Sequence, residues 1–129
     1  EEGRRLIHKR LTHLDVIFRY LAEHPLRHES IELNDNRISR MSAQRGKCSI
    51  TKKQLTVYDM RVHKIYPNGG DGYRNIDIVS SDAYELIHTK ESERAKELIT
   101  KLTSEGLWNE NALKKTNNYR ILVGNAIIE

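Results

Sequence analysis

Residues 62–88 read VHKIYPNGGDGYRNIDIVSSDAYELIH, and this stretch decides the predicted fold. The segment Pro-Asn-Gly-Gly-Asp-Gly at 67–72 predicts a loop, because glycine accepts positive φ and Asn and Asp side chains bond their own backbone. Residues 55–66 alternate in part between apolar and polar side chains, which predicts a strand before the loop. Residues 75–79 predict a second, short strand after it.

A helix is predicted next, over residues 82–89, with Ser81 as its N-cap. Apolar spacing, capping residues and turn residues predict the remaining elements. These are a helix over residues 4–23 that Pro25 ends, a helix from Asn34 or Asp35 to Gly46, a strand over 47–51 that pairs with 55–66 through a turn at 52–54, and helices over 91–102 and 109–123. The order of helices, hairpin, helix and further helices predicts an α+β fold.

Composition narrows the class of protein. A chain of 129 residues forms one ordinary domain, and its net charge of +4 weakly favours a polyanionic partner. The single cysteine, Cys48, excludes an internal disulfide and a four-cysteine zinc site. The sequence has no signal peptide and no apolar run of about 18 residues, so we expect a cytoplasmic protein without a membrane partner. Because the chain begins at Glu1 without a methionine, we expect it to be a piece of a longer polypeptide.

Three residues that suit metal chemistry follow in order along this segment: His63, Asn75 and His88. A one-metal nuclease needs side chains that hold a divalent cation on the scissile phosphate and a general base that takes a proton from water. Lys64 follows His63, but a lysine is protonated at neutral pH and is a base only if its pKa is depressed. Tyr84 shares a helix face with His88, yet a phenol is a poor ligand for magnesium or zinc. The residues therefore predict a divalent-metal site, for Mg²⁺ or Zn²⁺, with a reduced set of ligands.

A larger set of residues carries a family resemblance. These are Ser30-Ile31-Glu32, Asn34 to Ser39, Ala43 to Cys48, Asp59-Met60, Val62-His63, Pro67, Gly69-Gly70, Tyr73, Asn75, Leu86 to Thr89, Leu113-Lys114, Tyr119-Arg120 and Gly124-Asn125. From Lys9 to Asn125 the chain resembles the C-terminal region of bacterial group II intron reverse transcriptase/maturases, in which a DNA-binding segment leads into an HNH endonuclease domain.

The resemblance implies roles for the site residues. His63 and His88 stand at metal-ligand positions, and Tyr84 stands where that family has a further histidine ligand. Lys64 stands at the position of the general-base histidine, and Asn75 at that of the orienting asparagine. Ser80 also departs from a histidine that is common in the family. The positions that differ from the family are those that would carry out cleavage. We therefore expect a domain that keeps the fold but cleaves poorly.

The resemblance also implies an organisation and partners. Residues 1–46 are expected to form a helical DNA-binding or linker segment, and residues 47–129 an HNH-like ββα-metal domain with C-terminal helices. The two are expected to form one compact unit. The partners implied are DNA, intron RNA as a second nucleic acid, and a reverse transcriptase domain of the same polypeptide. Cations around the second helix suit phosphate contacts. They are Arg37, Arg40, Arg45 and Lys47.

Two alternatives remain open at this point. The first is an active metal-dependent DNA nickase that completes target-primed reverse transcription. In it Asp59, Asp71 or Asp77 completes the site and Lys64 stabilises the phosphate. The second is a regulatory or interaction module that uses the nuclease scaffold only as a frame. Metal-dependent nicking distinguishes the first alternative, and failure to bind nucleic acid at low salt distinguishes the second.

Overall fold

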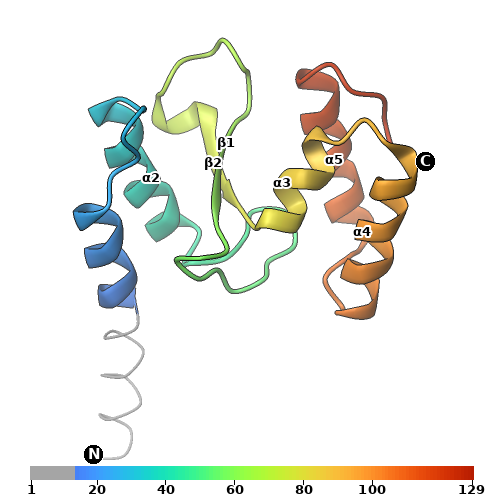
Figure 1. The fold of residues 1–129 in the computed structure, drawn as a ribbon, viewed down its shortest axis with the longest axis horizontal. Coiled ribbons are helices and arrows are strands. Elements are labelled where there is room, and N and C mark those ends of the chain that lie inside the picture. The colour runs from blue at the N-terminus through green and yellow to red at the C-terminus, as the bar shows by residue number, and fades with distance from the viewer. Residues whose placement is uncertain (1–13) are drawn as a thin grey trace, which may run out of the picture.

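The computed structural model describes residues 14–129, which form an α+β fold (Figure 1). Residues 14–23 are helical, and the first part of the predicted helix over residues 4–23 lies outside the described residues. The later elements are α2 (Ile31–Ala43), β1 (Arg61–Lys64), the short 3₁₀ helix η1 (Tyr73–Asn75), β2 (Ile76–Val79), α3 (Ser81–His88), α4 (Ser92–Ser104) and α5 (Glu110–Leu122). Among the described helices, none is long and apolar enough to cross a membrane.

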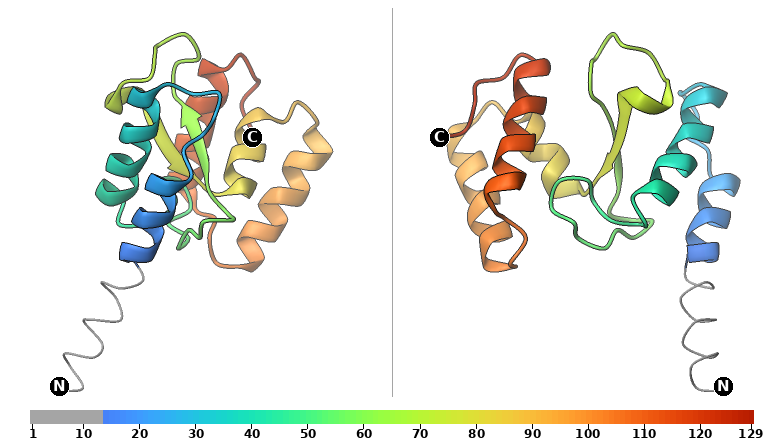
Figure 2. Two further views of the ribbon diagram at one scale, coloured as in Figure 1. Left: turned by 60° about the vertical axis from the view of Figure 1, so that its left-hand side comes forward. Right: turned by 180° about the vertical axis from the view of Figure 1, so that it is seen from behind.

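The two strands stand between two groups of helices (Figures 1 and 2). Residues 14–23 and α2 lie on one side of the strands, and α3, α4 and α5 lie on the other. The Gln44 side chain ties the end of α2 to the sheet, because its amide donates to Ile78 O at 2.8 Å and its carbonyl accepts from Ile78 N at 3.0 Å. The end of α2 is therefore fixed to β2.

The sheet differs from the predicted hairpin. β1 pairs antiparallel with β2, in the register His63 opposite Asp77 and Lys64 opposite Ile76, and not with residues 47–51. The predicted strands over 47–51 and 55–60 are wrong, because this segment turns tightly, with Lys52 at a φ of 63° and Cys48 N bonded to Lys53 O. Its apolar side chains enter the core from an irregular loop. They are Cys48, Ile50 and Leu55.

Capping side chains set where the helices begin. Ser30 Oγ accepts from Leu33 N at 2.9 Å, so α2 begins before the predicted start at Asn34 or Asp35. Ser80 accepts from Ala83 N, which makes Ser80 the N-cap of α3 in place of Ser81. The last two helices lie close to the predicted ranges.

A buried arginine fixes the carboxyl end of α3, where His88 lies. Arg120 of α5 donates from Nη1 to Leu86 O at 2.6 Å and to Thr89 O at 2.9 Å. The amide of Asn125 donates to Ile87 O at 2.9 Å. These bonds satisfy carbonyl groups that a helix end leaves free. The position of His88 relative to the sheet is therefore set by α5 as well as by α3.

Candidate functional site

Three of the predicted metal ligands lie together. The His63 ring of β1 is 5.4 Å from the His88 ring and 6.4 Å from the Tyr84 ring, measured between centroids. Tyr84 and His88 are four residues apart on α3, and their rings are 4.3 Å apart. Residues at this spacing share one helix face, which here faces the strand that carries His63. The structure thus brings together side chains that are up to 25 positions apart in the sequence.

His63 is buried, with 1% of its surface exposed. Burial, with a smaller contribution from His88, lowers the pKa of His63 to about 4, and the carboxylate of Asp77 partly opposes this shift. Burial also lowers the pKa of His88, which is the more exposed of the two rings. Both imidazoles are therefore neutral at pH 7. The Nε2 atom of His63 is buried without a hydrogen-bond partner among the described residues.

A polar network lies beside His63. Asp77 Oδ2 accepts from the hydroxyl of Tyr119 and from Ser49 Oγ, and it is 3.4 Å from Lys115 Nζ. The Tyr119 ring packs against the His63 ring at 4.8 Å. Burial, reinforced by Asp77, raises the pKa of Tyr119. The sequence did not predict a site role for Ser49, Lys115 or Tyr119. Lys115 and Tyr119 are four residues apart, so the sequence could have indicated that their side chains share one face of the helix.

Asn75 holds the loop between the strands. Its Oδ1 accepts from Tyr66 N at 2.9 Å, and its Nδ2 donates to Tyr66 O at 3.0 Å and to Gly70 O at 2.8 Å. Gly69 lies so close that a Cβ atom there would be 2.8 Å from Asn75 Nδ2. The asparagine therefore orders the loop that leads from β1 into β2.

Lys64 lies on the other face of β1 from His63. Its Nζ is 3.0 Å from Asp71 Oδ1 and 3.7 Å from Glu29 Oε2. The hydrogen bond with Asp71, followed by the charges of Glu29 and Asp71, raises the pKa of Lys64. Asp71 also accepts from Ser30 Oγ at 2.6 Å, which links the loop to the start of α2. Lys64 is therefore a charged anchor of the loop and not a proton acceptor at neutral pH.

The four predicted nucleic-acid contacts lie in different settings. Arg37 is 6% exposed and donates to Leu21 O and His24 O. Arg40 donates to Tyr73 O at 2.8 Å, and its guanidinium stacks over the Tyr73 ring at 4.1 Å. Arg45 and Lys47 are exposed just after α2. The charges of Arg40, Arg45 and Lys47 are therefore within reach of a bound polyanion, whereas the charge of Arg37 is not.

Two further lysines share one carbonyl oxygen. Lys52 Nζ donates to Ser49 O at 3.0 Å, and Lys115 Nζ donates to the same oxygen at 3.4 Å. Two ammonium groups on one carbonyl oxygen concentrate positive charge beside Asp77. The structure thus shows two cations besides those that the sequence predicted.

The candidate third acids each have other partners. Asp59 pairs with Lys53 at 2.9 Å and accepts from Ser81 N, while Asp71 and Asp77 have the partners described above. Within residues 14–129, no group of three or more His, Cys, Asp or Glu side chains is arranged to hold a metal ion. Two imidazoles and a phenol fall short of the three protein ligands of a typical catalytic zinc site. The donor set does not fit a tightly bound catalytic metal.

Comparison with protein-family models, curated proteins and solved structures finds no match for this chain.

Proposed function

We propose that this chain is a nucleic-acid-binding domain built on an HNH endonuclease frame with impaired cleavage, and that it serves intron mobility as part of a group II intron-encoded protein. One observation carries the proposal. His63 on β1 and Tyr84 and His88 on α3 converge on one site. Asn75 orders the loop between the strands of that unit. This is the strand, loop, strand and helix order that the sequence resemblance implies for a ββα-metal site.

The residues of this site also support the proposal that cleavage is impaired. Cleavage at neutral pH needs a proton acceptor near the attacking water, and Lys64 is protonated and paired with Asp71. Tyr84 offers a phenol where a third imidazole would complete a ligand set. We therefore expect Mg²⁺ or Zn²⁺ to bind weakly at most.

Nucleic-acid binding is supported by the cations around the end of α2. Arg45 and Lys47 are exposed, and Lys52 and Lys115 meet at Ser49 O. Each phosphate neutralised by such a group releases counterions and makes the affinity salt-dependent. DNA is the expected partner, with intron RNA as the second, and a reverse transcriptase domain of the same polypeptide would supply the remaining contacts.

The first experiment measures binding to a DNA duplex and to RNA by fluorescence anisotropy between roughly 50 and 200 mM salt. Replacing Arg45 and Lys47 by glutamine is expected to weaken binding and to lower the salt slope by about 2. The double variant Lys90→Gln, Lys96→Gln removes the same charge from the surface of the 90–100 region and is the matched control. Absence of binding by the parent chain at low salt favours the interaction-module alternative.

The second experiment separates impaired from active cleavage. Supercoiled plasmid is incubated with magnesium, manganese or zinc, and nicking is measured for the parent chain and for His63→Ala. We expect binding without nicking. Nicking that disappears with His63→Ala would establish the nickase, although Asp59, Asp71 and Asp77 each have a competing cationic partner in the structure.

A further inference from the structure

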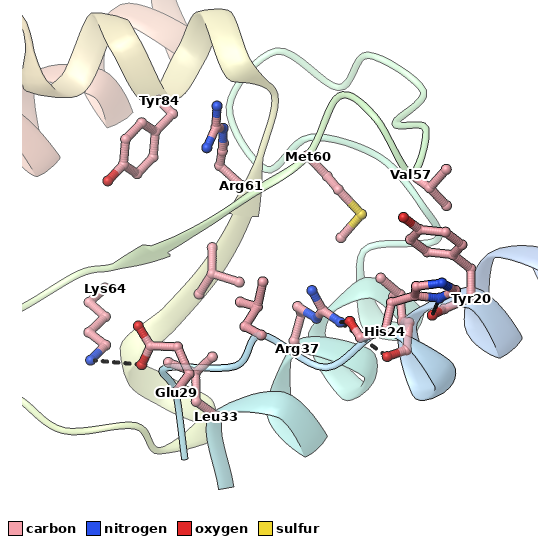
Figure 3. Close-up of a pocket in the computed structure, with 13 residues that line it drawn as sticks. Tyr20, His24, Glu29, Leu33, Arg37, Val57, Met60, Arg61, Lys64 and Tyr84 are labelled. Atoms are coloured by element: carbon pink, nitrogen blue, oxygen red, sulfur yellow. Dashed lines mark hydrogen bonds and ion pairs between the residues drawn. The ribbon is translucent and has the colours of Figure 1, made fainter. Parts of the chain in front are cut away.

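A cavity of about 360 Å³ borders β1 and shares Tyr84 with the His63 site (Figure 3). Residues 14–24, α2, β1 and the start of α3 contribute its walls. Part of the lining is apolar, including Leu21, Leu33 and Met60, and the rings of Tyr20 and Tyr84 also line it. The volume falls at the lower end of the range of small-molecule pockets, roughly 300–1,000 Å³.

The wall of this cavity contains a buried cation that has no counter-ion in the described part of the chain. Arg37 is 6% exposed, and no carboxylate within residues 14–129 forms an ion pair with it. Its Nη2 donates to Leu21 O at 3.1 Å and to His24 O at 2.8 Å, while its Nε is buried without a partner among the described residues. Burial lowers the pKa of Arg37, which shows that the charged form is poorly solvated there.

The other charges around the cavity leave an excess of positive charge. Arg61 and Lys64 line it together with Arg37, and Glu29 is the one carboxylate in the lining. Glu29 is already 3.7 Å from Lys64. Figure 3 shows this pair at a distance from Arg37, with Met60 between the Arg61 end and the Tyr20 end of the pocket. Within residues 14–129, no carboxylate therefore balances the charge of Arg37.

We propose that this cavity binds a small organic oxyanion with an apolar ring. The carboxylate or phosphate group would pair with the guanidinium of Arg37, and the ring would lie among Leu21, Leu33 and Met60. A buried charge is costly unless it is paired, so an anion that pairs with Arg37 offsets a cost the free protein already bears. This site is independent of the proposed nucleic-acid function, because Arg37 is too buried to reach a polymer phosphate.

The probe is phenyl phosphate, with benzoate as the carboxylate analogue and inorganic phosphate and phenol as the separate halves. Binding is followed by nuclear magnetic resonance at the side-chain Nε–H signal of Arg37. We expect phenyl phosphate or benzoate to shift that signal and to bind about tenfold more tightly than either half. Binding that leaves the Arg37 signal unchanged would place the anion on the outer basic surface and overturn the proposal.

Two variants test the same site in different ways. Arg37→Met removes the cation, and Val57→Phe fills the cavity from a half-buried loop position without changing Arg37. Each is expected to weaken binding of the probe by at least about tenfold, whereas Lys90→Met, which removes an exposed cation elsewhere, is expected to leave it unchanged. If Arg37→Met fails to fold, Val57→Phe alone decides, and unchanged affinity in that variant would refute the cavity as the site.

Discussion

His63 and Asp77 are directly opposite each other across the antiparallel strands, yet the Asp77 carboxylate is bound by Tyr119, Ser49 and Lys115. The buried Nε2 of His63 has no partner among the described residues. The acid that is closest in register to the histidine is thus neutralised by a lysine and occupied by hydroxyl donors. Burial and the neighbouring His88 keep His63 a neutral imidazole, and the charge of Asp77 opposes this only in part.

Replacing Asp77 by asparagine tests this network. Asp77 is 6% exposed. The change removes the charge that Lys115 pairs with and leaves a neutral amide oxygen as the only acceptor for Tyr119 and Ser49. We expect the free energy of unfolding to fall by about 2 kcal/mol, the usual scale for hydrogen bonds to a charged group. Urea unfolding measures the loss.

Asp82→Asn is the matched control, because Asp82 pairs with Lys101 at a solvent-exposed site. Its loss of stability is expected to be clearly smaller. A loss in Asp77→Asn no larger than in Asp82→Asn would mean that the buried network contributes little to stability.

The low pKa of His63 predicts a dependence of stability on pH. An unfolded histidine has a pKa of about 6.5, whereas the pKa of the folded His63 is about 4. The unfolded state therefore binds the proton more readily, and stability falls as pH decreases from about 6.5 towards 4. From this group we expect a loss of about 2 kcal/mol between pH 7 and pH 5.

Urea unfolding at a series of pH values measures this slope. His63→Leu keeps an apolar side chain of related size and should flatten the slope in this window. His88→Gln should remove a smaller part, since burial also lowers the pKa of His88. An unchanged slope in His63→Leu would assign the pH dependence to other groups.

The parts of the fold that could be predicted are those with local signals. The side chain of Asn109 accepts a hydrogen bond from Ala112 N, and α5 begins at the next residue. Asparagine favours this N-cap role because its side-chain oxygen can bond a free backbone N–H. β2 and the glycine loop also lie where the sequence places them. The segment over 47–60 was mispredicted, because burial of Cys48, Ile50 and Leu55 depends on contacts with distant elements and not on strand pairing.

The site was predictable to the same extent. The four-residue spacing of Tyr84 and His88 is local, and it correctly placed both rings on one face. The setting of Arg37 also had a signal, since Leu33, Arg37 and Met41 are four residues apart and all three are buried. The Asp77, Lys115 and Tyr119 network joins β2 to α5, and spacing along the chain carries no information about that contact.

Gly69 and Asn75 form a pair whose coupling can be measured. A Cβ at Gly69 would be within 2.9 Å of three atoms of the Asn75 carboxamide. Gly69→Ala is therefore expected to reduce stability by about 1–3 kcal/mol, because either the carboxamide or the loop must move. In an Asn75→Ala background the same substitution meets no such atoms and should cost much less.

A double-mutant cycle by urea unfolding gives the coupling free energy. Asn68→Ala, at an exposed position of the same loop, serves as the control. Equal costs of Gly69→Ala in both backgrounds would show that the loop, and not the carboxamide, resists the added methyl group.

Tyr84→His tests whether the frame can hold a metal once the ligand set is completed. The Tyr84 ring is 4.3 Å from the His88 ring and 6.4 Å from the His63 ring, so a histidine there would place three imidazoles on one site. Both native imidazoles are neutral at pH 7, which is the form that binds zinc. We expect Zn²⁺ to raise the unfolding temperature of this variant, with a gain of about 2.7 kcal/mol at a zinc concentration 100 times the dissociation constant.

Tyr84→Phe is the control, since it removes the phenol without adding a ligand. The double variant Tyr84→His, His63→Ala should lose the gain, because it returns the site to two imidazoles. If zinc stabilises Tyr84→Phe as much as Tyr84→His, the metal binds elsewhere. If it stabilises neither, the three side chains lie close together but cannot share a metal ion, and the impairment that we propose would then extend to the geometry of the site as well as to its residues.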